Sequence, residues 1–383
     1  MSVTAARGFR AAGVTAGLKD SNNRDVAVVI NDGPSRAAAG VFTRNRVRAA
    51  PVLWSEQVLG GGRVRAVVLN SGGANACTGP AGFQDTHATA EHAADALADS
   101  ASEIAVCSTG LIGERLPMES LLLGVTDALS SADVSGGLAA ADAIRTTDTV
   151  AKIGFRRGEG YSIGGMAKGA GMLAPGLATM LVVLTTDADL PSERLDHLLR
   201  AATATTFDRL DSDGCMSTND TVLLLASGAS TVRPEEEDFA ALLTELCQDL
   251  AEQLLADAEG ASHTIAIQVV GAASEDEAVD VGRAVARSAL FKTAIYGRDP
   301  NWGRIVSAVG TTDARFEPDR INVAVNGVWV CRAGAAGEPR DKVDLSGRDV
   351  DVTIDLGAGS HGATVWTNDL TVDYVYENSA YST

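Results

Sequence analysis

The chain alternates short apolar runs with longer runs in which apolar residues recur at helical spacing. Runs rich in Val, Ile and Leu predict buried strands, and apolar residues every three or four positions predict amphipathic helices. The strands predicted in the first 275 residues are Val26–Ile30, Val64–Leu69, Ile104–Cys107, Met180–Thr185, Val222–Ala226 and Ile265–Val270. The predicted helices are Thr86–Leu97, Met118–Ala128, Ser192–Thr205, Pro234–Ala256 and Glu275–Ala289, the last with Ser274 as its N-cap.

Beyond about Gly297 the pattern changes to short alternating strands joined by Gly, Asp and Asn turns. These strands are Ile321–Val325, Val328–Cys331, Val350–Asp355 and Ala363–Thr367, and Asn326-Gly327 is a hairpin signal between the first two. We therefore expect a main domain up to residue 285 and a smaller α+β domain over residues 286–383. The chain does not open with the strand, glycine loop and helix of a doubly wound nucleotide fold. A layered α/β sandwich is the better prediction for the main domain.

The composition of the chain argues against several classes of function. The 383 residues carry 31 Lys and Arg against 50 Asp and Glu, a formal net charge of −19. Because nucleic acids and anionic membranes attract proteins of positive potential, this balance argues against both as partners. The longest apolar run, Met172–Leu184, is too short to span a membrane and contains Pro175. The first twenty residues carry no apolar signal core, which predicts a cytoplasmic protein.

Neither the cysteines nor the histidines predict a metal site. The five cysteines contain no C-x-x-C pair, which is typical of reduced thiols. Only His87 and His92 are close in sequence, and at about 100° per residue they point about 140° apart on a helix. We therefore expect no metal ligand set.

One segment, residues 164–188, carries most of the chemical signal. Its glycine-rich beginning contains Lys168, a lone cation able to reach an anionic group, and residues 161–168 do not form a clean strand pattern. Thr179 follows a Gly/Pro loop and opens the apolar run predicted as a buried strand. Cleavage before this threonine would free an α-amine, which titrates near ~7.7–8.0 and can serve as general base for the hydroxyl.

Other interpretations of the segment are weaker. Residues 169–174, GAGMLA, match the G-x-G-x-x-A of a dinucleotide fold, but no clean strand precedes them and Pro175 would fall early in the helix. The segment is not a P-loop either, because Lys168 is followed by glycine. A threonine at the start of a strand is usually structural, so spacing alone does not establish catalysis at Thr179.

Several motifs, found in the same order along nearly the whole chain, help to decide between these interpretations of the segment. The Ala-Thr-Met-Leu run is Ala178–Leu181, and the other motifs are Asn70–Ala76, Ser108–Gly113, Thr146–Thr149, Ser217–Asp220, Gly297–Arg304 and Glu377–Thr383. Together they resemble the ornithine acetyltransferase, or glutamate N-acetyltransferase (ArgJ-type), family, in which the Ala-Thr-Met-Leu run carries a self-cleavage site. So many ordered matches are far more specific than any single motif.

The resemblance implies a fold and a role for each matched position. The fold is a layered αββα sandwich of the α/β (α+β) class. Cleavage between Ala178 and Thr179 would give an α chain of residues 1–178 and a β chain whose residues 179–285 complete the main domain. Thr179 would be the nucleophile, with its own amine as base, and Thr109 and Gly110 would form the oxyanion hole. The implied substrate-binding residues are Thr146, Lys168, Thr179, Glu259, Asn378 and Thr383.

The resemblance also implies a reaction. An acetyl group would pass from N2-acetylornithine to glutamate through an acetyl-threonine intermediate, as a step of arginine biosynthesis. Lys168 suits a substrate carboxylate, and Glu259 suits the cationic amine of ornithine. No metal or nucleotide is expected, although some members of the family accept acetyl-CoA as donor, and an α2β2 assembly of processed chains is implied.

Two alternatives stay open. In a related self-processing aminopeptidase or amidase, water would replace glutamate as acceptor. In a non-catalytic metabolite-binding protein, the chain would stay intact.

Overall fold

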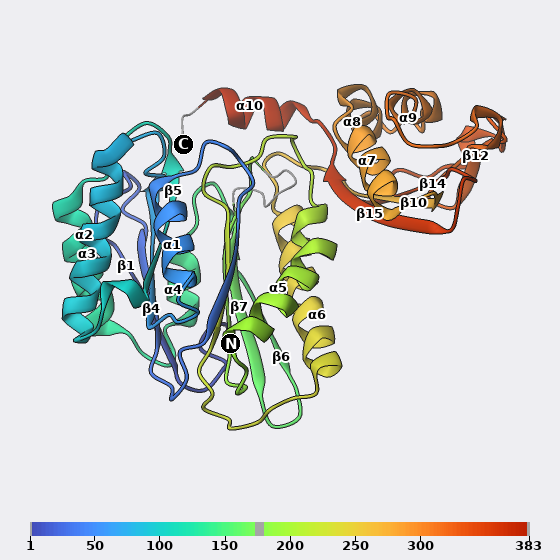
Figure 1. Cartoon of the computed structure of the whole chain (residues 1–383). Helices are drawn as coiled ribbons and strands as arrows, with labels where there is room; N and C mark the ends of the chain where they lie inside the picture. Colours follow the sequence, from blue (N-terminus) through green and yellow to red (C-terminus); the bar gives the residue numbers. More distant parts are fainter. Residues whose placement is uncertain (1, 173–179, 381–383) are drawn as a thin grey trace.

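The main body has four layers, with two β-sheets packed face to face and helices on the outer side of each (Figure 1). The structure is a computed structural model that describes residues 2–172 and 180–380. Apolar side chains from both sheets share one core, which includes Val28, Val68, Leu181 and Leu223. The layered αββα sandwich expected from the sequence is therefore confirmed.

The first sheet has the strand order β1-β2-β4-β5, in which only β4 and β5 are parallel. Helices α2 and α3 cover its outer face. Every residue of β2 is buried, which explains its continuous apolar run. The elements are β1 (Phe9–Val14), β2 (Val26–Asn31), β4 (Ala66–Gly73), β5 (Ile104–Leu111), α2 (Gly79–Leu97) and α3 (Met118–Ser131).

Both edges of the first sheet are covered by helices, α1 (Ala50–Leu59) beside β5 and α4 (Gly137–Ala143) beside β1. The hydroxyl of Ser55 donates to the carbonyl of Val106 and accepts from its amide, at 2.7 and 2.9 Å. At Val106, this hydroxyl makes the two hydrogen bonds that a neighbouring strand would otherwise supply.

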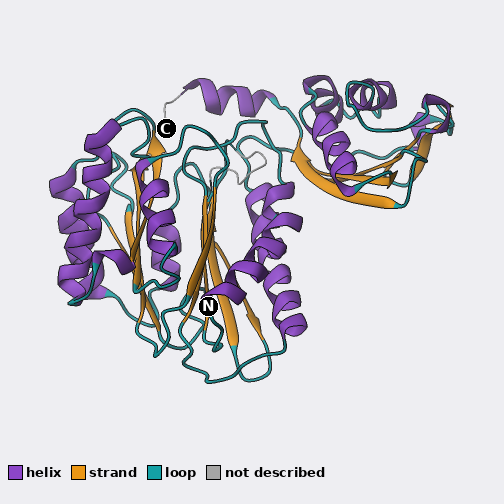
Figure 2. Cartoon of the chain, viewed as in Figure 1, coloured by secondary structure: helices purple, strands orange, loops and turns teal. Residues whose placement is uncertain are grey.

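The second sheet has the order β3-β9-β8-β7-β6, with helices α5 and α6 on its outer face (Figure 2). Strands β8 and β9 are parallel and fully buried. The predicted strands and helices of this part are confirmed, with ends shifted by a residue or two. The elements are β3 (Ala38–Phe42), β6 (Lys152–Arg157), β7 (Ser162–Lys168), β8 (Leu181–Thr186), β9 (Thr221–Ala226), α5 (Ser192–Thr205) and α6 (Glu236–Ala256).

The glycine-rich residues 162–168 form β7, a strand between β6 and β8, so the expectation that no clean strand precedes Gly169 is wrong. The strand lacks large side chains because both of its faces are crowded. A Cβ on Gly164 would lie 2.1 Å from the Ser2 carbonyl oxygen, and one on Gly165 would lie 2.9 Å from Leu184 and Leu250. Close approach by neighbouring chain, rather than a loop conformation, explains these glycines.

The C-terminal module has its own core and a sheet in the order β13-β12-β11-β14-β10-β15. The predicted hairpin is confirmed, since Asn326 and Gly327 have φ of 47° and 77° between the paired strands β11 and β12. The module takes in β10 and α7, which the sequence analysis assigned to residues 179–285. Its elements are β10 (Thr264–Ala272), β11 (Asn322–Val325), β12 (Val328–Arg332), β13 (Ala335–Ala336), β14 (Asp349–Asp355), β15 (His361–Asn368), α7 (Glu275–Ala286), α8 (Ala289–Tyr296) and α9 (Trp302–Val309).

After β15 the chain returns toward the main body through α10 (Val372–Ala380), as Figure 1 shows. The hydroxyl of Thr371 donates to the Gly260 carbonyl at 2.6 Å and fixes the start of this helix. Within residues 2–172 and 180–380, no helix is long and apolar enough to cross a membrane.

The crowding at Gly164 gives a stability prediction. Gly164→Ala should lower the free energy of unfolding by about 1–3 kcal/mol, because the added methyl must displace the Ser2 backbone from β7. Gly347→Ala is the control, since its added methyl would meet nothing within 4 Å. Thermal unfolding of both variants measures the effect. Equal midpoints for the two variants would contradict this packing.

Candidate active site

One cavity of about 340 Å³ lies where the two sheets of the main body meet α10 and the loop after α6. It brings together all six described residues to which the sequence analysis gave a role. Those that line it are Thr109, Gly110, Thr146, Lys168, Glu259 and Asn378. Residues separated by up to 269 positions in the chain therefore share one cavity, although their roles stay predictions.

Thr109 and Gly110 reach the cavity because the pairing of β4 with β5 is irregular at its end. The register shifts at Gly72 and Gly73, opposite Thr109 and Gly110. Such an irregularity bends the strand and redirects its side chains. Gly110 has φ of 129°, and a Cβ there would lie 2.5 Å from the Gly73 amide nitrogen. Only glycine fits this position, which explains the Thr-Gly pair in the sequence.

Lys168 ends β7 and is 1% exposed. Its Nζ donates to Thr146 Oγ1 at 2.8 Å and to Thr109 Oγ1 at 3.3 Å, so the second sheet contacts the first through this side chain. Burial lowers the pKa of the Lys168 ammonium, and the charge of Asp148 opposes that shift.

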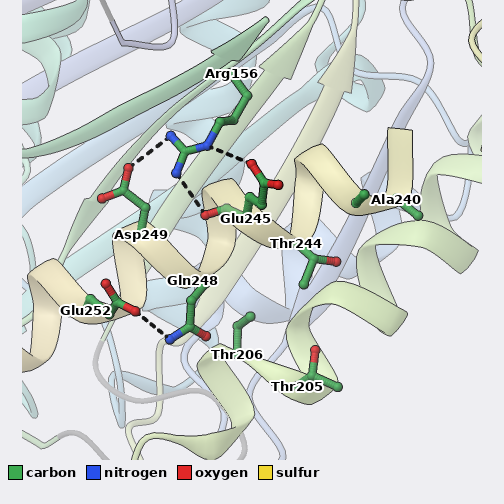
Figure 3. Close-up of a pocket in the computed structure, with 10 residues that line it drawn as sticks. Arg156, Thr205, Thr206, Ala240, Thr244, Glu245, Gln248, Asp249 and Glu252 are labelled. Carbon is green, nitrogen blue, oxygen red and sulfur yellow. Dashed lines mark hydrogen bonds and ion pairs between the residues drawn. The ribbon is translucent and has the colours of Figure 1, made fainter. Parts of the chain in front are cut away.

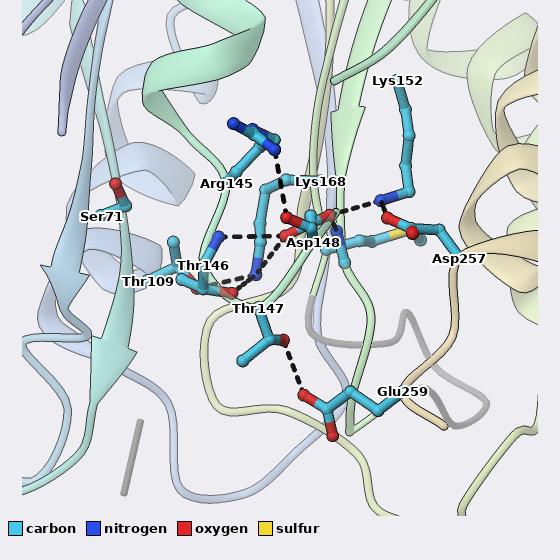
Figure 4. A network of polar contacts seen from close by, with 12 residues as sticks. Ser71, Thr109, Arg145, Thr146, Thr147, Asp148, Lys152, Lys168, Asp257 and Glu259 are labelled. Carbon is cyan, nitrogen blue, oxygen red and sulfur yellow. Dashed lines mark hydrogen bonds and ion pairs between the residues drawn. The ribbon is translucent and has the colours of Figure 1, made fainter. Parts of the chain in front are cut away.

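The Asp148 carboxylate is the centre of a buried polar network (Figure 4). Oδ1 accepts from Lys152 Nζ and from the Gly169 amide, both at 2.6 Å, and Oδ2 accepts from the Thr146 amide at 3.0 Å. Oδ2 also lies 4.0 Å from Lys168 Nζ. Burial alone would raise the pKa of this carboxyl, but the two lysines and these hydrogen bonds hold the pKa at about 2.

Lys152 completes the network on the other side. Its Nζ lies 2.6 Å from Asp257 Oδ2 as well as from Asp148, and its side chain is fully buried. Asp257 also accepts from the Thr149 amide at 3.0 Å. Each buried charge therefore has an opposite charge or hydrogen-bond donors against it, as burial of ions requires.

Glu259 lies in the loop after α6 and is held from two sides. Oε1 accepts from Thr147 Oγ1 at 2.6 Å, and Oε2 accepts from Asn378 Nδ2 at 3.0 Å. Its own amide donates to the Ala170 carbonyl at 2.9 Å. Asn378 belongs to α10, so this helix contributes a side chain to the lining of the cavity.

Three predicted site residues, Ala178, Thr179 and Thr383, lie outside the described residues. The next described residue is Met180, whose amide donates to Asp220 Oδ1 at 3.2 Å. Asp220 is fully buried, and that burial raises its pKa well above the ordinary value.

Sequence reasoning gave no role to Asp148, Lys152, Asp257 or Asp220. Asp148 and Asp220 stand in motifs that were recognised, but their partners are distant in sequence. The sequence offers one hint of this network, because Lys152 is a charged residue at the start of a strand that also contains apolar residues. In the described part of the chain, no cluster of His, Cys, Asp or Glu is arranged to hold a metal ion.

A larger cavity of about 990 Å³ lies on the outer side of α5 and α6 (Figure 3). Its only cation, Arg156, is already paired with Asp249 at 3.1 Å and Glu245 at 3.4 Å. Of the residues predicted to act on a substrate, none that the structure describes lines this larger cavity. The smaller cavity is therefore the candidate active site.

The network gives a pH prediction for stability. Because the folded pKa of Asp148 is about 2, against an ordinary value of 3.8, its carboxylate stabilises the fold above about pH 4. That contribution, about 2 kcal/mol, should be lost as the pH falls from about 4 to about 2. Asp148→Asn should cost about 3–5 kcal/mol at neutral pH and flatten the acid dependence, because Lys168 loses its nearest carboxylate and Lys152 keeps only that of Asp257.

Urea unfolding between pH 2 and pH 7 measures this effect. Asp196→Asn is the matched control, since its partner Arg200 is 60% exposed and such pairs contribute about 0–1 kcal/mol. The network would be unimportant for stability if the two variants unfolded alike at every pH.

Comparisons with known proteins bear on the whole chain. The ArgJ family model matches residues 10–383. "Arginine biosynthesis bifunctional protein ArgJ" of Thermobifida fusca is 73% identical over 383 residues and covers 100% of both chains. The protein of that name from Mycobacterium tuberculosis (strain H37Rv) is 56% identical over 388 residues, covering 99% of this chain and 96% of its own.

Two solved structures are also similar. The ornithine acetyltransferase of Mycobacterium tuberculosis, complexed with ornithine, is 58% identical over 47% of this chain and 96% of its own, with a TM-score of 0.45. The bifunctional protein ArgJ of Bacillus halodurans is 35% identical over 51% of this chain and 97% of its own, with a TM-score of 0.49. Both scores lie below 0.5, so the assignment rests on the sequence matches. On those matches, the chain belongs to the ArgJ family.

Proposed function

We propose that this protein is a self-processing acetyltransferase of arginine biosynthesis that moves an acetyl group from N2-acetylornithine to glutamate. Membership of the ArgJ family and the shared name of its relatives support the pathway. The observation that carries the proposal is the convergence of Thr109, Gly110, Lys168 and Glu259 on one cavity. Hydroxyl and amide donors, a cation and a carboxylate are the groups that acyl transfer between two amino acids needs.

Processing comes first in the proposed mechanism. Thr179 Oγ1 attacks the Ala178 carbonyl carbon, the peptide C–N bond breaks, and the Thr179 nitrogen takes up a proton. Water then hydrolyses the ester and leaves residues 1–178 and residues 179–383 as separate chains. The new α-amine, with an ordinary pKa of about 7.7–8.0, is a base suited to neutral pH.

Acetyl transfer uses the same hydroxyl. Thr179 Oγ1 gives its proton to the α-amine and attacks the acetyl carbonyl of N2-acetylornithine. The negative charge on the carbonyl oxygen is stabilised by the Thr109 hydroxyl and the Gly110 amide. The C–N bond then breaks, ornithine leaves with the proton, and an acetyl ester remains on Thr179. Glutamate then attacks this ester through its neutral amine and the ester C–O bond breaks. The α-amine of Thr179 passes the proton released by glutamate to Thr179 Oγ1, and N-acetylglutamate leaves.

Substrate recognition follows from the charges of the cavity. Lys168 lies against the α-carboxylate shared by ornithine and glutamate, with Thr146 beside it. Glu259, whose two oxygens are already oriented by Thr147 and Asn378, binds the side-chain ammonium of ornithine. Thr383 completes the substrate contacts of the C-terminal segment.

The proposed reaction exchanges one amide for another, so it requires no metal and no nucleotide. Acetyl-CoA is a second acetyl donor in this proposal, in keeping with the word "bifunctional" in the names of the relatives. The processed chains assemble as α2β2.

The first test is the mass of the purified protein. Processing should give two chains of residues 1–178 and 179–383, and N2-acetylornithine should add one acetyl group to the second chain. Thr179→Ala should give one intact, inactive chain, whereas Thr205→Ala, an exposed threonine in the cavity of Figure 3, should behave as wild type. A cleaved and active Thr179→Ala protein would overturn the proposal.

The second test concerns the oxyanion hole. Thr109→Val keeps the shape of the side chain but removes the hydroxyl donor, so kcat should fall by ~10²–10³-fold with a small change in KM. Thr109→Ser should retain most of the activity. Steady-state kinetics with N-acetylglutamate as measured product also separate transfer from hydrolysis, which would release acetate instead. A kcat unchanged in Thr109→Val would exclude this residue from the oxyanion hole.

A further inference from the structure

Lys168 contacts two threonine hydroxyls of the protein, in addition to the substrate carboxylate proposed for it. An ammonium group can only donate hydrogen bonds, so the hydroxyls of Thr109 and Thr146 both accept from Lys168 Nζ. Two of its three N–H groups are directed at these hydroxyls. The side chain is almost completely buried, and a lysine is seldom buried unless its ammonium has partners.

Accepting from Lys168 constrains the Thr109 proton. A hydroxyl has one proton and two lone pairs, and the bond from Lys168 occupies a lone pair on one side. Within residues 2–172 and 180–380, the Thr109 hydroxyl donates to no protein acceptor. The bond from Lys168 leaves the other sides of the Thr109 oxygen for its proton, and Thr109 lines the cavity. Because a cation bonded to the oxygen polarises the O–H bond, the hydroxyl also becomes a stronger donor.

The position of Lys168 is fixed from behind. Asp148 Oδ2 lies 4.0 Å from its Nζ, and Asp148 is itself held by Lys152 and by the Gly169 amide. Lys152 is held in turn by Asp257. These contacts form a chain that leads from the loop after α6 to the first sheet (Figure 4). Its members, in order, are Asp257, Lys152, Asp148, Lys168 and Thr109.

We propose that Lys168 is a positioning residue for the reaction, which directs the Thr109 hydroxyl proton into the cavity, and that Asp148 holds Lys168 in place for this task. This role rests on the proposed function and adds to the substrate contact of Lys168. Lys168 would therefore stabilise the transition state rather than the bound substrate. The negative charge on the carbonyl oxygen, to which Thr109 donates, develops only as the reaction proceeds.

A double-mutant cycle between Lys168 and Thr109 tests the role. If Lys168 acts through the Thr109 hydroxyl, Lys168→Met should lower kcat by roughly 10–100-fold in the wild-type background. In the Thr109→Val background the same change should alter kcat by less than about 2-fold, because the hydroxyl that it orients is gone. KM should rise in both backgrounds, since the carboxylate contact is separate.

The measurement is the single-turnover rate of acetyl transfer to Thr179, counted per processed chain by mass spectrometry. Lys292→Met is the matched control, because Lys292 is also buried and its Nζ also donates to a threonine hydroxyl, Thr367 Oγ1 at 3.2 Å, in the C-terminal module. This control should leave kcat unchanged.

The outcomes separate the two proposals. If the wild-type protein does not transfer acetyl groups, the proposed function fails. If it does, and the losses of Lys168→Met and Thr109→Val multiply, the positioning role alone is overturned. Should Lys168→Met yield no processed chain, Asp148→Asn carries the same comparison, and its kcat loss must likewise vanish in the Thr109→Val background.

Discussion

The carboxylate of Asp148 joins the chain segments that form one side of the cavity. It binds the ammonium of Lys152 at the start of β6, the amide of Gly169 after β7 and the amide of Thr146 after α4. A carboxylate without partners could not stay charged at this depth, because desolvation costs several kcal/mol. Thr146 and Lys152 flank Asp148 in the chain and Gly169 follows β7, so this carboxylate ties the loop between α4 and β6 to the end of β7.

The site depends on three parts of the molecule that could not form it separately. The first sheet contributes Thr109 and Gly110 at an irregular strand end, and the second contributes Lys168 at the end of β7. The C-terminal module contributes Asn378 through α10, which contacts Glu259. The common core of the two sheets sets the separation of Lys168 from Thr109, so packing far from the cavity controls a contact inside it.

Hydrophobic periodicity predicted the elements whose apolar residues are large, such as β2, β9 and α5. It missed β7 because Gly164 and Gly165 make room for neighbouring backbone and helix side chains, and it missed α10, which buries no residue. At the site, the roles of Thr109 and Glu259 came from the family resemblance rather than from spacing. The Asp148 network could not be predicted, because Lys152 and Asp257 are 105 positions apart and only the fold brings them together.

A crystal structure of the protein soaked with N2-acetylornithine, without glutamate, would show where the acetyl group is held. We expect an acetyl ester on Thr179 whose carbonyl oxygen lies about 2.7–3.1 Å from Thr109 Oγ1. In that structure Lys168 Nζ should still contact Thr109 on the side away from the ester. An acetyl group on another residue would rule out Thr179 as the nucleophile, and a carbonyl oxygen turned away from Thr109 and Gly110 would rule out their oxyanion hole.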